Sequence, residues 1–100
     1  MRKYRVLISG EARRMLTEHV HFLAGVSKEA ARKLQKRMMD AIRSLEQMPE
    51  RYPYLDPADR RSAYRKMVVP KTYLVLYTVE ADTVYVEYII DGRQDFSWLL

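Results

Sequence analysis

The feature that most constrains the fold is a long apolar stripe at helical spacing in residues 28–48. The stripe consists of Ala30, Leu34, Met38, Ala41, Ile42, Leu45 and Met48. Apolar side chains that recur every three or four residues line one face of an α-helix, and here the charged residues fall outside that face. Ser27 can cap the start of this helix, and Glu29 places a negative charge in its first turn, where the helix dipole favours one. We therefore expect an amphipathic helix over about residues 28–48.

Another helical pattern, over about residues 10–24, precedes the 28–48 helix in the chain. Its apolar positions are Ala12, Leu16, Val20 and Leu23, with Met15 and His19 beside them. Ser9 is its expected N-cap and Gly25 its expected end. Because the link to the next helix is so short, we expect the two helices to pack as an antiparallel hairpin.

Four short segments rich in β-branched and aromatic residues predict strands. They cover residues 4–8, 63–69, 73–79 and 83–90. Pro49, Pro53 and Pro57 exclude regular structure from about 49 to 61, although the aromatic residues there predict a packed loop. The first strand must join the sheet formed by the others, because an isolated strand would leave its backbone unpaired. The predicted fold class is α+β, a β-α-α-β-β-β two-layer fold with a helical hairpin on a mainly antiparallel four-stranded sheet, in one domain over residues 1–100.

Composition narrows the classes of function. The chain has no cysteine, which excludes disulfides and thiolate metal sites, and no apolar run that approaches a membrane span. We expect a cytoplasmic protein. The net charge of +5 lies in the helical half, because residues 1–50 hold 11 Lys/Arg and 6 Asp/Glu, whereas residues 51–100 hold 7 of each. A basic face of this kind can bind nucleic acid or an acidic protein, or can simply be solvated.

Several common chemistries lack their residues. Gly10, Gly25 and Gly92 are the only glycines, so a phosphate-binding or dinucleotide-binding glycine loop is excluded. His19 and His21 are two residues apart on a helix and point to different sides, so they cannot share a metal. His19 is expected to touch the core from the helix face, and we expect no metal and no cofactor. Without cysteine, and with no histidine near any serine on the predicted sheet, a nucleophile–base triad has no obvious members.

Two groups of charged residues remain as candidate sites. Arg65 and Lys66 lie in the second predicted strand, where neighbouring side chains point to opposite faces, so only one of them can serve any single site. Asp91, Arg93 and Asp95 follow the last strand. Arg93 either binds phosphate with its guanidinium group or pairs with a neighbouring carboxylate and fixes the tail.

Apolar residues supply further candidates for contact with a partner. Methionine adapts well to partner surfaces, which makes Met38 and Met39 candidates, although methionines in a helical stripe are more often core. The tail after Gly92 is expected to pack Phe96, Trp98 and Leu99 onto the body of the domain. Tryptophan and arginine are enriched at binding hot spots, so the surface around Arg93 and Trp98 is a candidate for target contact.

This order of elements resembles the RelE/ParE toxin superfamily, and four local patterns carry the same resemblance. They are Tyr4-x-Val6-x-Ile8 followed by Ala12; Ala30-x3-Leu34 to Ile42-x2-Leu45 leading into Pro49-x3-Pro53; Tyr64-Arg65 before Tyr73-x3-Tyr77; and Ile89-Ile90-x-x-Arg93-x-Asp95. The resemblance covers nearly the whole chain. It implies a growth-inhibiting toxin of a bacterial type II toxin–antitoxin system, of the kind that serves plasmid stabilization. It also implies a small cognate antitoxin that wraps the toxin's apolar groove, for which Met38 and Met39 are the candidate contacts.

The superfamily contains two mechanisms. RelE-like members cut mRNA in the ribosomal A site with basic residues of the sheet and the C-terminus, and ParE-like members inhibit DNA gyrase. By position, Arg65 and Arg93 match basic residues of the cleaving group, so they are the catalytic candidates if this chain is a ribonuclease. Leu74 stands where a further arginine is expected, and Asp91, Phe96 or Trp98 stands where an acid–base residue is expected.

Cleavage at a 2′-hydroxyl needs an acid, a base and charge stabilisation together. The sequence supplies only charge stabilisation, and it therefore favours a ParE-like toxin that acts by binding through Arg65, Arg93 and Trp98. The alternatives are a ribosome-dependent mRNA endoribonuclease and a degenerate toxin that retains only the fold.

Overall fold

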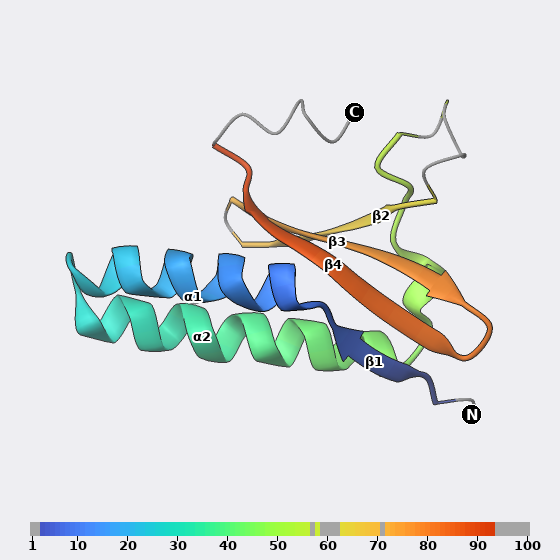
Figure 1. The fold of residues 1–100 in the computed structure, drawn as a ribbon, viewed down its shortest axis with the longest axis horizontal. Helices are drawn as coiled ribbons and strands as arrows, with labels where there is room; N and C mark the ends of the chain where they lie inside the picture. The colour runs from blue at the N-terminus through green and yellow to red at the C-terminus, as the bar shows by residue number, and fades with distance from the viewer. Residues whose placement is uncertain (1–2, 57, 59–62, 71, 94–100) are drawn as a thin grey trace.

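The computed structural model describes residues 3–56, 58, 63–70 and 72–93, in which two helices cover one face of a four-stranded sheet (Figure 1). The elements are β1 (Arg5–Ile8), α1 (Gly10–Ala24), α2 (Lys28–Arg43), the short 3₁₀ helices η1 (Ser44–Glu46) and η2 (Pro49–Arg51), β2 (Arg65–Val69), β3 (Tyr73–Glu80) and β4 (Thr83–Asp91). The predicted α+β class and the predicted element order are confirmed.

The strands lie in the order β1-β4-β3-β2. β2, β3 and β4 form an antiparallel meander, and β1 pairs in parallel with the outer side of β4, so the first strand joins the sheet as expected. A bulge shifts the register between β3 and β4 at Leu76/Tyr77. β2 begins at Arg65, two residues later than predicted, because Ala63 has a left-handed backbone (φ 58°) that a strand does not accommodate.

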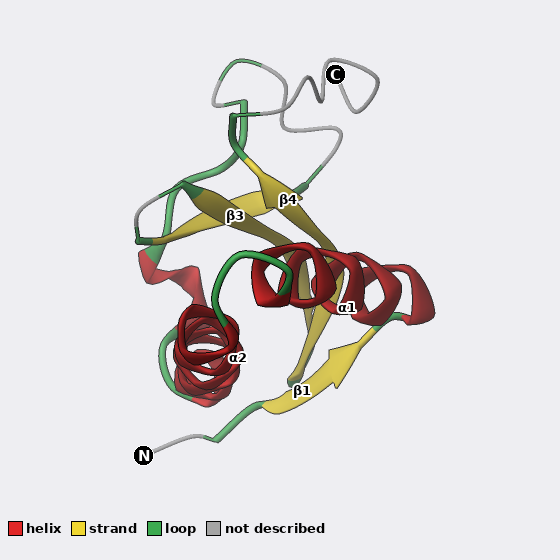
Figure 2. Cartoon of the chain, turned by 90° about the vertical axis from the view of Figure 1, so that its left-hand side faces the viewer, coloured by secondary structure: helices red, strands yellow, loops and turns green. Residues whose placement is uncertain are grey.

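Serine side chains start both helices. The Oγ of Ser9 accepts a hydrogen bond from the backbone N–H of Ala12 (3.0 Å), and the Oγ of Ser27 accepts one from Ala30 (3.1 Å). α1 ends at Ala24 as predicted, but Gly25 continues in the right-handed region (φ −67°) and does not form a left-handed cap. The two helices run antiparallel, side by side (Figure 2). Within the described ranges, no helix is long and apolar enough to cross a membrane.

The core lies between the helical hairpin and the sheet. Its fully buried members (exposed fraction below 2%) include Met38, Leu45, Val75, Tyr77, Val84, Val86 and Ile89. Side chains alternate along a strand, so Leu76 of β3 points away from this core. Leu76 is nevertheless buried, and so is Ile90 of the neighbouring strand β4. Both faces of the central strand are therefore apolar, as the sequence indicated. The expected packing of Phe96, Trp98 and Leu99 lies outside the described residues.

The end of α2 differs from the prediction. α2 stops at Arg43, and the chain tightens into η1 before Met48 adopts a left-handed backbone (φ 48°) with its side chain 66% exposed. Met48 therefore does not belong to the buried face of the helix. At the other end of that face, Ala31 is buried and the predicted Ala30 is only half-buried. A residue before proline is disfavoured in the helical region, so Met48 does not continue the helical path, and proline itself starts a helical turn well, which accounts for η2. The exclusion of regular structure was thus wrong at residues 49–51.

The loop after α2 is packed, as predicted. Pro49 is buried, and its carbonyl accepts a hydrogen bond from the hydroxyl of Tyr77. Burial raises the pKa of Tyr77 to about 12, so this hydroxyl keeps its proton at neutral pH. The guanidinium group of Arg51 donates to the carbonyls of Gln47 and Met48, which lie just beyond the end of α2. These contacts fix the loop beside the start of β2.

Candidate functional site

Arg65, a predicted target-binding residue, begins β2 and turns its side chain toward the loop that follows η2. Its Nη1 donates to the carbonyl oxygens of Tyr52 (2.7 Å) and Glu50 (3.1 Å). The guanidinium carbon lies 4.2 Å from the centroid of the Tyr54 ring, a cation–π contact. Tyr54 also forms a single β-bridge with Arg65. The side chain therefore ties the sheet to the loop.

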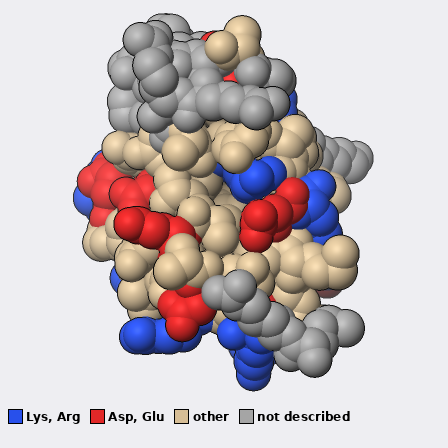
Figure 3. Space-filling view, turned by 90° about the vertical axis from the view of Figure 1, so that its right-hand side faces the viewer, with Lys and Arg blue, Asp and Glu red and all other residues tan. Residues whose placement is uncertain are grey.

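A hollow of about 310 Å³ lies beside this arginine. It is lined by Glu50, Tyr54, Ala63, Arg65, Val79 and Ala81. Figure 3 shows the end of the molecule that carries the β3–β4 hairpin, where acidic and basic side chains are interspersed. One arginine opposite one carboxylate gives the hollow no net positive charge with which to attract phosphate.

Arg93, the second predicted site residue, follows the end of β4 and forms a two-pronged ion pair with Asp91. Nε lies 3.0 Å from Oδ1 and Nη2 lies 2.7 Å from Oδ2, and the backbone N–H of Arg93 also donates to Oδ1. Asp91 is only 8% exposed. The hydrogen bond from the Arg93 side chain lowers the pKa of Asp91 and outweighs burial, which acts in the opposite direction. Of the two roles considered for Arg93, the structure shows the ion pair.

The sheet register keeps Arg65 and Arg93 apart. Arg65 lies opposite Tyr77 in β3, whereas Asp91 lies opposite Tyr73, four residues earlier in the same strand. At roughly 3.3 Å per residue these positions are about 13 Å apart along the sheet, and Arg93 lies beyond the farther one. The two arginines consequently do not converge on one phosphate.

His19 lies near the end of β4, close enough for its charge to act on Asp91, and spacing in the sequence did not reveal this. Its Nε2 lies 2.8 Å from the carbonyl oxygen of Ile89, so this nitrogen carries the proton and donates it. Its ring packs against Tyr73, with the centroids 5.3 Å apart. Burial, followed by the charge of Asp91, raises the pKa of Tyr73. The half-buried His19 thus makes the core contact that was expected from the helix face, through residues 54 and 70 positions away in the chain.

These polar groups do not make a metal site. In the part of the chain that the structure describes, no group of three or more His, Cys, Asp or Glu side chains could hold a metal ion. Asp91 already forms an ion pair with Arg93, and Nε2 of His19 already forms a hydrogen bond with the backbone carbonyl of Ile89. The cluster can hold the end of β4 against α1, and it presents the outer side of the Arg93 guanidinium to solvent.

The two methionines predicted to contact an antitoxin separate in the structure. Met38 has an exposed fraction of 0% and belongs to the core, so a partner could reach it only by opening the domain. The helical stripe places it there, and the interpretation of Met38 as a surface contact has to be corrected. Met39 is partly buried at the margin of the core and keeps some accessible surface. Trp98, predicted for target binding, lies outside the described residues.

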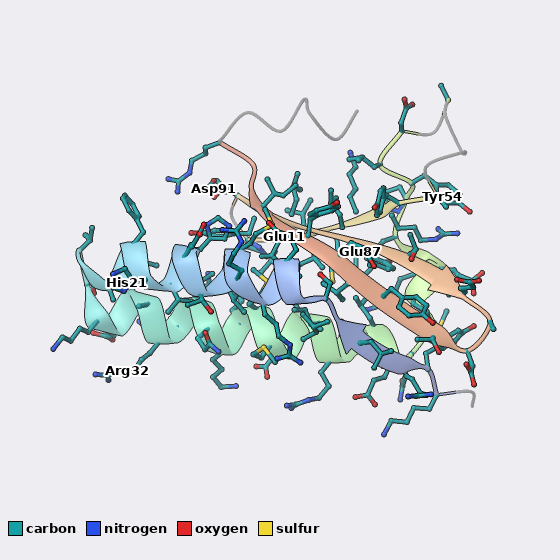
Figure 4. The ribbon with its side chains drawn as sticks, in the orientation of Figure 1. Glu11, His21, Arg32, Tyr54, Glu87 and Asp91 are labelled. Atoms are coloured by element: carbon teal, nitrogen blue, oxygen red, sulfur yellow. The ribbon has the colours of Figure 1, made fainter. Side chains whose placement is uncertain are left out.

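The outward face of α2 carries much of the basic excess. A shallow hollow there is lined by Lys33, Lys36, Arg37 and Asp40. Lys33 pairs with Glu29 (3.3 Å) and Lys36 with Asp40 (2.7 Å), whereas Arg37 donates to a backbone carbonyl of the β2–β3 link. Figure 4 shows Arg32 pointing away from the helix at the end nearest the hairpin link. The face offers cations to an acidic partner and no enclosed pocket.

Comparison with known proteins agrees with this architecture. The family model described as ParE toxin of type II toxin-antitoxin system, parDE, matches residues 6–96. A solved structure described as the chromosomal ParDE TA system from P. aeruginosa superposes with a TM-score of 0.72 at 12% sequence identity, covering 91% of this chain and 98% of the other. No curated protein sequence gives a significant match.

A helical hairpin on one face of a four-stranded sheet, with this structural likeness, defines a small domain of the RelE/ParE toxin fold. Because the family match extends over residues 6–96, the chain belongs to the ParE toxin family of type II toxin–antitoxin systems. The resemblance seen in the sequence is thereby confirmed, on the ParE-like side.

Proposed function

We propose that this ParE-family toxin arrests growth by binding a cytoplasmic protein target such as DNA gyrase, and that a cognate antitoxin neutralises it. The observation that carries the proposal is that the two arginines that a ribonuclease would use, Arg65 and Arg93, are both bonded to the protein's own groups. Arg65 donates hydrogen bonds to two backbone carbonyls, and Arg93 forms a two-pronged ion pair with Asp91. A binding toxin needs only a stable exposed surface, and these contacts stabilise one.

The ribonuclease alternative needs more than the described residues supply. A phosphorane intermediate carries charge that preorganised donors must meet together, and a 2′-hydroxyl needs a base within hydrogen-bond reach. Arg65 and Arg93 lie near opposite ends of their strands. His19 is the histidine nearest to Arg93, and its Nε2 is bonded to a backbone carbonyl. This geometry favours binding over cleavage.

The antitoxin is expected to be acidic and to approach the helical side of the toxin. α2 carries an excess of cations on its outward face, and Met39 contributes apolar surface beside it. The ParDE structure that this chain resembles is described as a toxin–antitoxin system, which supports the same kind of pairing here. Opposite charges speed association, and apolar contacts slow dissociation.

The test is controlled expression of the chain with and without the product of its neighbouring gene. We expect growth arrest by the toxin alone, rescue by the neighbour, altered DNA supercoiling and intact mRNA. The purified pair should bind tightly in calorimetry, with an association rate that falls as salt increases. Codon-specific mRNA cleavage would establish the ribonuclease instead, and a folded chain without effect on growth would indicate a degenerate toxin.

A further inference from the structure

The link between the two helices presents the most exposed apolar side chains among the described residues. Phe22 in the last turn of α1 and Val26 just after it are each 76% exposed. They are four residues apart, and Gly25 between them keeps helical backbone angles, so both side chains lie on neighbouring turns of one surface. We call this surface, formed by Phe22 and Val26, the hairpin tip. It lies at the end of the helices that extends past the sheet (Figure 1).

The hairpin tip is held by backbone hydrogen bonds, and its two side chains lie outside the hydrophobic core. Val26 donates to the carbonyl of Leu23 (3.0 Å), and Ser27 donates to the same carbonyl (2.8 Å) before it caps α2. On the inner side of α1, the core contacts are made by other residues, including Leu16 and Leu23. A preformed apolar projection loses little conformational freedom when it binds.

Unpaired cations border the hairpin tip. The carboxylates in this region are already engaged, Glu18 by Arg14 and Glu29 by Lys33. Lys28 begins α2 next to the link, and Arg32 lies one turn, roughly 6 Å, further along the helix. Neither of these two cations forms an ion pair within the described part of the chain. The start of α2, next to the hairpin tip in the chain, therefore carries two cations that could meet carboxylates of a partner.

We propose that the hairpin tip, with Lys28 and Arg32, is the surface that enters the toxin's target protein, at an apolar pocket rimmed by carboxylates. This inference rests on the proposed function, because it names the surface by which the toxin would bind its target. An antitoxin that wraps the domain requires a groove, whereas a rigid projection of one aromatic and one aliphatic side chain suits insertion into a pocket. Aromatic anchors and arginines of this kind dominate the free energy of binding at interfaces.

The experiment compares the full-length parent with Phe22→Ser/Val26→Ser, using Val68→Thr as the control. Val68 is 55% exposed on the edge strand β2, far along the chain from the hairpin tip. Each variant is assayed for thermal unfolding, antitoxin binding, growth arrest and inhibition of purified DNA gyrase. A second variant, Lys28→Glu/Arg32→Glu, tests the charged rim.

We expect the hairpin-tip variant to melt within a few degrees of the parent and to bind antitoxin with less than a twofold change in Kd. Its potency in growth arrest and in gyrase inhibition should fall at least tenfold, the effect of losing one hot spot. The charge-reversed variant should lose potency and most of the salt dependence of inhibition. Val68→Thr should match the parent in all four assays.

Full growth arrest by the hairpin-tip variant would overturn the inference while leaving the proposed function intact. Loss of antitoxin binding by the hairpin-tip variant would assign the surface to the antitoxin and would also overturn the inference. A parent that is a dimer and a variant that is a monomer would assign the surface to a second copy of the chain, with the same consequence. If the parent stops growth without inhibiting gyrase, the gyrase assignment fails and the growth-arrest comparison still decides the inference. A parent that does not stop growth removes both.

Discussion

Replacing Arg65 with alanine should destabilise the domain more than it impairs a binding activity. The side chain makes two charge-assisted hydrogen bonds to backbone carbonyls and one cation–π contact. The hydrogen bond to the half-buried carbonyl of Tyr52 contributes about 1.5–3 kcal/mol, the exposed one to Glu50 contributes less, and an exposed cation–π contact adds about 0.5–1 kcal/mol. We expect a total loss of about 2–4 kcal/mol, which lowers the Tm of a domain of this size by roughly 10–20 °C.

The measurement is urea and thermal unfolding of the parent, Arg65→Ala and Arg65→Lys. Lysine keeps the charge but lacks the planar group that contacts Tyr54 and both carbonyls together, so Arg65→Lys should recover less than half of the loss. Below the melting temperature of Arg65→Ala, its antitoxin binding should match that of the parent. A variant that melts like the parent and has lost its toxicity would refute this reasoning and return Arg65 to the target-binding surface.

Three further substitutions test other contacts. Tyr77→Phe leaves a buried carbonyl without its donor, so it should lose about 1–3 kcal/mol in urea unfolding. Because folding raises the pKa of Tyr77 to about 12, the parent should also lose stability as pH rises from 10 to 12, a loss that this variant shows less steeply. Arg93→Ala should lower the Tm at pH 7, and the difference from the parent should vanish in acid. The reason is that the Arg93 hydrogen bond holds the folded-state pKa of Asp91 below its usual 3.8, so the ion pair is lost as the pH falls through that pKa. Gly92→Ala should lower the Tm at every pH, because an added Cβ would lie 2.7 Å from a backbone oxygen, and an unchanged Tm would show that the β2–β3 link yields easily.

The helices and strands could be predicted because their local signals agree. Ser9 and Ser27 both cap helices as expected, and the stripe from Leu34 to Leu45 faces the core. The same periodicity could not show where α2 ends, since Met48 continues the spacing but precedes a proline and turns outward. The loop beyond α2 is held by Tyr77, a contact between distant parts of the chain that spacing in the sequence does not show.

The candidate sites were less accessible to sequence reasoning. Arg65 and Arg93 were singled out as candidate site residues, but a guanidinium group looks the same in a sequence whether it meets phosphate, the protein's own backbone or a neighbouring carboxylate. The stripe that predicted α2 already placed Met38 in the core, and that signal should have outweighed methionine's general aptitude for interfaces. Phe22 stands outside the apolar positions that predicted α1, and its exposure agrees with that pattern, although the pattern could not show what the exposed ring contacts.

The most direct test of the central claim uses the purified toxin in two parallel reactions, DNA supercoiling by gyrase and incubation with programmed ribosomes. We expect the toxin to inhibit supercoiling, added antitoxin to reverse the inhibition, and ribosome-bound mRNA to remain intact. Arg93→Ala, assayed below its melting temperature, should leave the mRNA result unchanged, because that arginine is held by Asp91. Cleavage of mRNA in the ribosomal A site, abolished by Arg65→Ala or Arg93→Ala in folded protein, would show that the toxin is a ribonuclease and not a gyrase-binding protein.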